Sequence, residues 1–295
     1  MIDEKDKLMS LIRSCICAPE GKEFLCADFN AIEARVVLWM VGDEPALEIF
    51  RTGQDIYCDM AESIYGHAVN KKDHPEKRAL GKTCILGLSY GMGHKKFGDT
   101  CEQQGVDLSG LNPEDIVKTY RTKYKKIRNW WYSCEDWAVA AIREPDTVHG
   151  RGLIRFKCST KRDALLCQLP SGRLLSWCKP WLDEEYETPW GAKKPQIHYS
   201  GLDITKHWSD QTTYGGSMVE SIVQGTARDL LCEAMLRLDR AGYNIVMHVH
   251  DEVMAEVDEG AESLDVFCDI MKEVPEWAEG CPIEVEGFSG RRFRK

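Results

Sequence analysis

The stretch MHVHDEVMAEV, residues 247–257, decides how the rest of the chain is interpreted. Apolar and β-branched residues flank His250, Asp251 and Glu252 on both sides, which predicts a strand, a tight turn and a second strand. Two adjacent acids in such a hairpin mark either a solvated turn or a site. A carboxylate at a rigid strand end, opposite another carboxylate on a neighbouring strand, is what two hard cations about 4 Å apart require. The interpretation therefore depends on a distant partner for Asp251.

Asp28 is the candidate partner. The segment FLCADF, residues 24–29, is typical of a short buried strand that runs into an acid. Residues 32–39 continue as a helix, because their apolar positions recur at helical spacing. Asp28 is thus expected at the end of a buried strand, as a site shared with the hairpin would require.

Bulk properties indicate a globular chain with a real core. The 295 residues suffice for one large domain or two smaller ones, and 43% of them are hydrophobic. No apolar run approaches the roughly 18 residues that span a bilayer, and MIDEKDKLMS at the N-terminus lacks the regions of a secretory signal. We therefore expect a cytoplasmic protein with no membrane partner.

Cysteine content and charge restrict the class of protein further. The 13 cysteines are odd in number and scattered, with no CxxC, which favours reduced, mostly buried thiols over a metal site. The net charge of −10 argues mildly against nucleic acid as a partner. The charge of a whole chain does not describe one cleft, so local motifs must decide.

The remaining pattern predicts an α+β core that carries a helical insertion. Turn signals crowd residues 150–200, which indicates irregular, sheet-containing structure, and mainly helical patterns extend from about residue 44 to 145. Individual elements are expected as helices over 75–90, 113–143 and 216–238, and as a hairpin over 243–257.

The segment DFNAIEARV, residues 28–36, resembles motif A of the family A DNA polymerases. Asp28, Ile32, Glu33 and Arg35 match the pattern of that motif. The segment GDEPALEIFRTGQDIY, residues 42–57, is similar to the segments that follow motif A in the family.

A second motif lies in EKRALGKTCILGLSYG, which resembles motif B of the same family. Arg78, Lys82, Leu86 and Tyr90 recur every four residues and are expected along one face of a helix. Two cations followed by an apolar and an aromatic group suit the phosphates and base of a nucleoside triphosphate. The alternative, a solvated basic stripe on a half-buried helix, is disfavoured beside motif A.

The opening stretch supplies the third motif, because HVHDEV resembles motif C. TYGGSMVESIVQGTARDLL, residues 213–231, is similar to the helix that precedes motif C and carries Gln224, which in the family reads the minor groove. LPSGR, residues 169–173, and the closing residues 275–295 resemble bacteriophage and prophage members. The resemblance covers nearly the whole chain in three ordered motifs.

The resemblance implies a fold and a function. The fold is α+β, a palm with an antiparallel sheet and an inserted helical fingers subdomain. Residues 1–43 are implied as palm, 44–145 as fingers, and 146–295 as palm with an irregular β insertion and the motif C hairpin. The function implied is that of a DNA-directed DNA polymerase, which transfers a nucleotide from a dNTP to a primer 3′-hydroxyl on primer-template DNA, in a bacterial or phage-infected cell.

The resemblance also assigns roles to residues. It implies that Asp28 and Asp251 hold two Mg²⁺ ions, that Glu252 supports this site, and that Lys82 acts as a general acid. The incoming nucleotide would be bound by a set of five side chains: Arg78, Lys82, Leu86, Tyr90 and Glu33, the last of which would crowd the 2′ position of the sugar. Contacts with DNA are implied for Gln224, His250, Gly91 and Arg35.

Three residues depart from the family pattern. Leu86 stands where an aromatic residue is usual, which should alter sugar discrimination. Tyr57 replaces a His that is associated with a phosphate contact, and Glu220 replaces a frequent Asn.

The N-terminal part of the family pattern is missing from the sequence. Family members have an exonuclease or its remnant, a thumb and a primer-contacting palm segment before motif A, whereas Met1 stands 27 residues before Asp28. We expect a split enzyme whose N-terminal polypeptide carries the thumb, with or without an exonuclease. A gene fragment or a minimal enzyme would also account for the missing part.

Two further interpretations of the whole chain stay open. One is a single-subunit RNA polymerase, which Glu33 and the deoxy-type motif A disfavour, and the other is a non-catalytic replication scaffold or remnant. The run YRTKYKKIRNWWYSCEDW, residues 120–137, interleaves basic and aromatic residues as single-strand binding surfaces do. Template contact by this run is a secondary expectation.

Overall fold

The structure is a computed structural model that describes residues 12–108, 110–188, 191–203 and 205–293. The chain divides into two compact units. The first unit comprises Met1–Ile32 and Ala227–Lys295, and the second comprises Glu33–Thr226. Two helices, α2 (Ile32–Met40) and α9 (Gly215–Arg240), run across the boundary in sequence.

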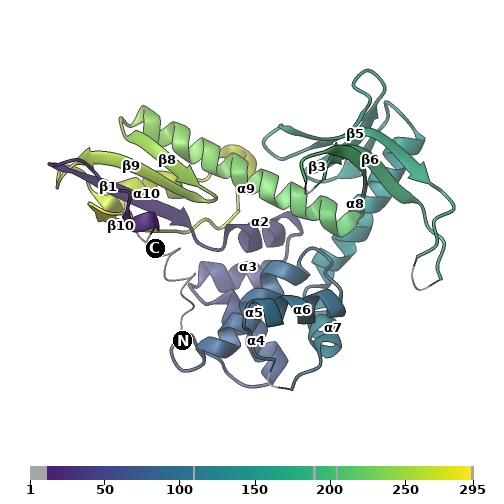
Figure 1. Ribbon diagram of the computed structural model, residues 1–295, viewed down its shortest axis with the longest axis horizontal. Helices are drawn as coiled ribbons and strands as arrows, with labels where there is room; N and C mark the ends of the chain where they lie inside the picture. The colour runs from purple at the N-terminus through teal and green to yellow at the C-terminus, as the bar shows by residue number, and fades with distance from the viewer. Residues whose placement is uncertain (1–11, 109, 189–190, 204, 294–295) are drawn as a thin grey trace. The chain divides into compact units, whose positions relative to one another are not determined.

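The first unit is built on a four-stranded antiparallel sheet in the order β10-β1-β9-β8 (Figure 1). Its strands are β1 (Lys22–Phe29), β8 (Asn244–Val249), β9 (Glu252–Asp258) and β10 (Val285–Gly290). The predicted strand and the predicted hairpin are both confirmed. The central strand β1 is paired at both edges, and its residues Phe24 to Ala27 are buried.

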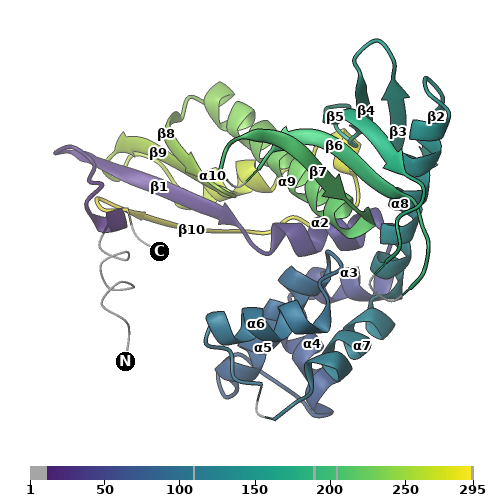
Figure 2. The same ribbon diagram turned by 45° about the vertical axis from the view of Figure 1, so that its right-hand side comes forward.

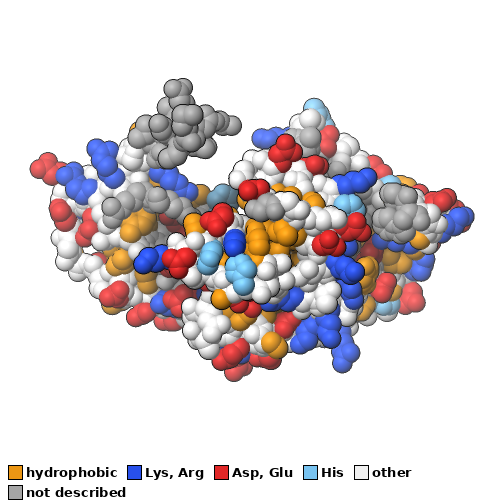
Figure 3. All heavy atoms as spheres, turned by 90° about the horizontal axis from the view of Figure 1, so that it is seen from below, with side chains coloured by type: hydrophobic (Ala, Val, Ile, Leu, Met, Phe, Trp, Pro, Cys, Tyr) orange, Lys and Arg blue, Asp and Glu red, His pale blue; other side chains and the backbone are white. Residues whose placement is uncertain are grey.

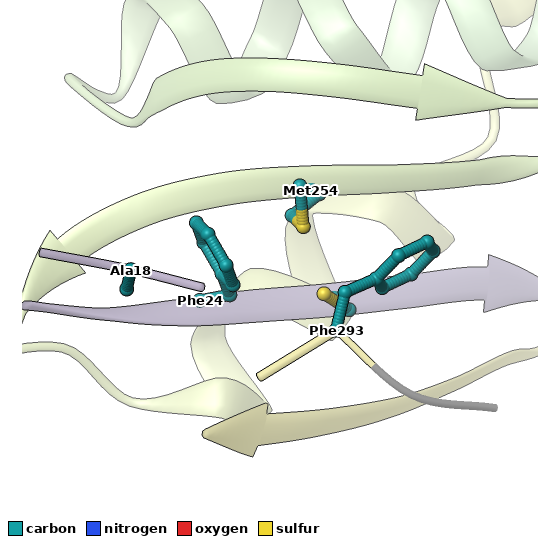
Figure 4. Packing of buried hydrophobic residues seen from close by; sticks show 5 residues of the cluster. Ala18, Phe24, Met254 and Phe293 are labelled. Atoms are coloured by element: carbon teal, nitrogen blue, oxygen red, sulfur yellow. The ribbon is translucent and has the colours of Figure 1, made fainter. Parts of the chain in front are cut away.

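Each face of this sheet has its own apolar partners. On one face Phe24, Cys26 and Met254 pack with Ala18 and Phe293, which come from segments flanking the strands (Figure 4). Helix α10 (Leu264–Lys272) packs against β10 and β1 and buries Phe267 and Met271. A short 3₁₀ turn, η1 (Glu276–Ala278), precedes β10.

The regular elements between residues 44 and 143 are all helices among the described residues, as expected for the insertion. They are α3 (Glu44–Arg51), α4 (Ile56–Tyr65), α5 (Pro75–Leu88), α6 (His94–Gln103), α7 (Pro113–Lys123) and α8 (Lys125–Arg143). Proline stands in the first turn of α3, α5 and α7. A backbone N–H there would have no acceptor within the helix, so proline costs no hydrogen bond.

Two helix predictions need correction, one at a break within the helix and one at its end. Residues 113–143 form two helices, because the backbone breaks at Tyr124, whose ring is buried and whose hydroxyl donates to Asp59 Oδ2 at 3.4 Å. The helix expected over 75–90 ends at Leu88, so Tyr90 lies in the turn that follows.

The sheet expected over residues 150–200 is confirmed, but its strands are more regular than expected. This region belongs to a six-stranded antiparallel meander, β2 (Val148–Arg151), β3 (Ile154–Ser159), β4 (Ala164–Gln168), β5 (Leu174–Asp183), β6 (Gln196–Leu202) and β7 (Trp208–Thr213), drawn in Figure 2. Helix α8 packs against β2 to β5, and Phe156, Leu165 and Trp177 are buried in this layer. The turn signal at residues 170–172 lies between β4 and β5 and Pro195 precedes β6, whereas Pro180 lies within β5.

The expected long helix is confirmed as α9, and its start depends on a glycine. A Cβ at Gly215 would lie 1.9 Å from the carbonyl oxygen of Trp131, so only glycine allows α9 to begin against α8.

The state of the cysteines and the distribution of surface charge can be compared with what the composition predicted. All 13 cysteines are free thiols, and most of them are buried, as predicted. Acidic and basic side chains are interspersed on the face drawn in Figure 3. Among the described residues no helix is both long and apolar enough to cross a membrane.

Candidate active site

Asp28 and Asp251 occupy adjoining positions of paired strands in the first unit. Strand β1 pairs with β9 so that Asp28 stands opposite Glu252, and the amide of Phe29 donates to the carbonyl oxygen of Asp251 at 3.2 Å. Both aspartates are half-buried. Two acids separated by most of the polypeptide are therefore brought together at one end of the sheet.

Asp251 lies in a two-residue turn between β8 and β9, because Val249 pairs directly with Glu252. His250, the other turn residue, has φ +54°, a left-handed conformation that is uncommon for a residue with a side chain. Such conformations suit two-residue hairpin turns, and they persist where the surroundings fix them. The turn exposes the His250 side chain and fixes the place of Asp251.

Glu252 is held in an ion pair that the sequence did not reveal. Its carboxylate is 6% exposed and accepts from Arg13 Nη1 at 2.9 Å. The Arg13 guanidinium also lies 4.7 Å from the ring centre of Phe293, whose amide donates to Ile16. Arg13 stands 239 residues from Glu252, and no spacing in the sequence links the two. Glu252 thus supports the hairpin from beneath.

The thiol beneath these acids is neutral. Burial, and to a lesser extent the charge of Glu252, raise the pKa of Cys26 to about 12. Cys26 therefore acts as a small apolar side chain in this part of the core.

The donor set at this end of the sheet fits a hard cation with an incomplete protein shell. Mg²⁺ is commonly held by one or two carboxylates, with substrate oxygens and water completing its octahedron. Asp28 and Asp251 supply two such carboxylates. Across the residues that the structure describes, no group of three or more His, Cys, Asp or Glu side chains is arranged to hold a metal. The two aspartates are thus a partial ligand set.

Arg78, in the second unit, is engaged with a helix cap. Its Nε donates to Asp55 Oδ2 at 2.6 Å, while Asp55 Oδ1 accepts from the amides of Tyr57 and Cys58 at the start of α4. The guanidinium also lies 5.0 Å from the ring centre of Tyr57, which is buried. Tyr57 therefore packs in the interior. Its buried ring does not replace the phosphate contact that is associated with His at this position.

Lys82 and Leu86 are exposed on the next turns of α5 and line a pocket of about 510 Å³. The pocket is enclosed by α5, α6 and the residues that follow each helix, and its other lining residues are Ala79, Thr83, Gly87, Met92, Thr100, Gln104 and Val106. A cation and an apolar side chain thus border one cavity.

Tyr90 does not continue the exposed face of α5, contrary to the expectation of one continuous surface. Its ring is 8% exposed, and its hydroxyl donates to Glu33 Oε2 at 2.6 Å. Burial and the charge of Glu33 raise the pKa of Tyr90 far above its usual range. Gln224 Nε2 donates to Glu33 Oε1 at 3.5 Å. Three predicted site residues, Glu33, Tyr90 and Gln224, therefore meet in one hydrogen-bonded group.

Gly91 and Glu220 lie close to this group. Gly91 has φ +82°, and a Cβ there would lie 3.3 Å from the ring of Tyr214. The pKa of Glu220 is raised by its burial and by the charge of Glu33, while Lys96 acts in the opposite direction. The replacement of Asn by Glu220 thus adds a second acid beside Glu33.

Arg35 lies in the interior, contrary to its expected contact with DNA. Its side chain is 6% exposed, and the guanidinium lies 4.2 Å from the ring centre of Phe50. A buried guanidinium stacked on a ring stabilises the packing of α2 and α3 and is not available to a phosphate.

The basic run of residues 120–137 is mostly occupied in helix packing. Lys123 pairs with Asp59 at 2.7 Å, Lys126 Nζ donates to the carbonyl of Gly42 at 2.6 Å, and Arg121 Nη2 donates to the carbonyl of Met92 at 3.3 Å. Tyr120, Tyr124 and Trp131 are buried. These contacts argue against the template contact expected for this run.

Comparisons with known proteins identify the family. The pattern of DNA polymerase family A matches residues 1–164. The chain is 38% identical over 292 residues to a DNA polymerase of Bacillus phage SP02, covering 98% of this chain and 44% of the phage protein. It is 27% identical to the thermostable DNA polymerase I of Thermus filiformis, covering 95% of this chain and 28% of that protein.

A solved structure shares the fold. The polymerase domain of Pol1 from M. smegmatis, in complex with DNA primer-template and dNTP, matches with a TM-score of 0.63 at 20% identity, over 99% of this chain and 43% of that one. The chain thus spans less than half the length of each of these relatives. With more than half of its residues matching the family pattern, the chain belongs to DNA polymerase family A.

Proposed function

We propose that this chain carries the catalytic residues of a DNA-directed DNA polymerase, which joins a dNTP to the 3′-hydroxyl of a primer. The observation that carries the proposal is the adjoining placement of Asp28 and Asp251 at one end of the β1–β9 pair. The family membership, and the relatives that are themselves named DNA polymerases, support it.

We assign Asp28 and Asp251 as ligands of two Mg²⁺ ions. When bound, such ions lower the pKa of the attacking hydroxyl and stabilise the charge that develops on the transferred phosphoryl group. Glu252, fixed by Arg13, keeps the hairpin in place beneath these ligands. His250 would position the primer end.

Lys82 is the residue proposed to bind the triphosphate and to pass a proton from Nζ to the pyrophosphate leaving group. Its exposed side chain is consistent with both roles. Arg78 would join the clamp by exchanging the Asp55 carboxylate for a phosphate oxygen, since both are anionic acceptors for its guanidinium. Leu86 would contact the sugar or base.

Glu33 is proposed to exclude ribonucleotides by crowding the 2′ position of the sugar. Its hydrogen bonds from Tyr90 and Gln224 restrain both carboxylate oxygens, which favours a fixed steric barrier. Gln224 and Gly91 would contribute to contacts with the DNA on the same side of this group.

The proposed division of the chain follows these roles. Residues 44–145, which contain helices α3 to α8, are the fingers, and residues 1–43 and 146–295 are the palm with its β insertion. We propose that a further polypeptide with a thumb, with or without an exonuclease, works together with this chain. The site of action would be the cytoplasm of a bacterial or phage-infected cell.

The test is primer extension with Mg²⁺ and dNTPs, by the chain alone and with a complementing family A segment added. Asp251→Asn should lower extension at least about a hundredfold, because metal-assisted charge stabilisation contributes several kcal/mol. Asp258→Asn, an exposed acid at the other end of β9, is the matched control and should extend normally. Equal extension by Asp251→Asn and wild type would rule out the proposed function.

A further inference from the structure

The six-stranded sheet carries a repeated feature that the polymerase site does not use. Lys179-Pro180-Trp181 stands in β5, and Lys206-His207-Trp208 stands at the start of β7. Trp181 is 47% exposed and Trp208 is 62% exposed, which is unusual for the largest apolar side chain. Both lysines have left-handed backbone conformations, with φ +48° for Lys179 and +63° for Lys206.

The two tryptophans lie on the same face of the sheet. Trp181 pairs with His198 on β6, and Trp208 pairs with Leu202 on the same strand. His198 and Leu202 are four residues apart, so their side chains share a face and are separated by about 13 Å along the strand. Ile197 is directed to the opposite face, where it is buried.

The Trp181 ring is held in position from beneath. It stacks on the ring of His198 with centroids 4.0 Å apart and planes at 19°. His198 Nδ1 lies 2.9 Å from Asp210 Oδ2, which fixes the imidazole. An exposed ring with so little freedom loses little entropy when it stacks on a ligand.

The two lysines that precede these rings are not engaged in ion pairs with described residues. Neither Lys179 nor Lys206 has an acidic partner among the residues that the structure describes. Nearby acids are engaged: Glu184 with Arg143 at 2.7 Å and Glu185 with Lys193 at 3.1 Å. A lysine whose ammonium group is in no ion pair with a described residue therefore stands two residues before each exposed tryptophan.

We propose that the face of Trp181 and Trp208, with Lys179 and Lys206 two residues before each ring, binds single-stranded nucleic acid. Bases stack on the two indoles without regard to sequence, and the lysines pair with backbone phosphates. A protein interface would have a contiguous apolar centre. Here Ser200 and Asp210, a polar pair, lie between the two tryptophans.

The test measures binding of a fluorescently labelled thymidine oligomer to the whole chain by fluorescence anisotropy. Trp181→Ala/Trp208→Ala should weaken binding at least about tenfold, since two stacking contacts are lost. Lys179→Gly/Lys206→Gly keeps the left-handed backbone and should lower the slope of log K against log salt by about 1.4, which is about 0.7 per lost phosphate contact.

Two control variants distinguish binding at this face from general effects of losing a ring or a charge. Tyr132→Ala removes an exposed ring from α8, and Lys193→Ala removes a paired lysine; both should bind the oligomer like wild type. The proposal is overturned if wild type fails to bind the oligomer at low salt, or if the folded lysine variant keeps the wild-type affinity and salt slope. Binding lost equally in the controls overturns it as well. None of these results depends on primer extension.

Discussion

The ion pair of Arg13 and Glu252 supports the hairpin that carries Asp251. Arg13→Ala would leave a nearly buried carboxylate without its donor and remove a guanidinium from the Phe293 ring. Because Arg13 itself is 31% exposed, we expect a loss of about 2 kcal/mol in the free energy of unfolding, below the range for fully buried pairs. Urea unfolding measures this loss of stability.

An exposed pair provides the control for this prediction. Arg51 pairs with Glu44 at 2.8 Å on the surface of α3, and Arg51→Ala should cost less than about 1 kcal/mol. Adding Glu252→Gln to Arg13→Ala should recover part of the loss. If Arg13→Ala unfolds at the same urea concentration as wild type, the pair does not support the hairpin.

Glu220 should make stability depend on pH. Burial, and then the charge of Glu33, raise its folded-state pKa above the ordinary value of 4.5. The folded state therefore holds the proton more tightly than the unfolded state, and stability falls as pH rises above 4.5. Glu220→Gln removes this loss and should raise Tm at about pH 7.

Thermal unfolding at several pH values tests the direction of this pH dependence. The advantage of Glu220→Gln should disappear as pH falls below 4.5, where Glu220 is protonated in both states. Glu259→Gln, an exposed acid in a turn, serves as the comparison variant. A variant that is less stable than wild type at neutral pH would contradict the expected direction.

Leu86 should determine part of the sugar selectivity. Leu86→Tyr places a hydroxyl at the mouth of the pocket beside Lys82. One hydrogen bond to the bound nucleotide would change the ratio of dideoxy to deoxy incorporation about five- to tenfold. Single-nucleotide incorporation measures this ratio, with Leu86→Phe separating the ring from the hydroxyl. Equal ratios in wild type and Leu86→Tyr would remove Leu86 from sugar recognition.

At the scale of elements, the close approach of α4 and α5 depends on Gly81. A Cβ there would lie 2.0 Å from the carbonyl oxygen of Tyr57, so Gly81→Ala must separate the helices. We expect a loss of about 3 kcal/mol or more, which exceeds the roughly 1 kcal/mol gained from helix propensity. Chemical denaturation measures the change.

Gly98 in α6 is the control for Gly81. A Cβ at Gly98 would make only an ordinary contact, 3.5 Å from Pro113 Cγ. Gly98→Ala should therefore be neutral or stabilising by up to about 1 kcal/mol. Similar effects of the two substitutions would contradict the close packing of α4 on α5.

The elements that the sequence predicted correctly have strong local signals. The hairpin at β8 and β9 alternates apolar residues around two acids, and β1 is a continuous apolar run. The sequence predicts sheet in this region but not the regularity of the meander of β2 to β7, because Pro180, Pro189 and Pro195 are typical of chain breaks. Pro180 in fact lies in a strand with a register shift between Cys178 and Trp181, where proline is tolerated.

Contacts between distant residues explain the errors at the site. The sequence placed Arg35 and Tyr90 on motif positions, but their burial depends on Phe50 and Glu33, which no local pattern connects to them. Arg13 was missed for the same reason. Motifs indicate candidate residues for a site, whereas tertiary packing determines which of their side chains remain exposed.

At the scale of the molecule, each compact unit contains one half of the proposed chemistry. The first unit holds Asp28 and Asp251, and the second holds Lys82 and the group around Glu33. The similarity to the phage DNA polymerase covers 98% of this chain and therefore includes both units. The shared metal site of the first unit is the claim on which the catalytic proposal depends.

Binding of Mn²⁺, followed by electron paramagnetic resonance of the free ion, tests that claim most directly. Asp28→Asn and Asp251→Asn should each weaken Mn²⁺ binding, because each removes a carboxylate from the same site, and the double variant should bind no more tightly than either single variant. Asp258→Asn should bind as wild type does. Unchanged Mn²⁺ affinity in either single variant would contradict a joint site.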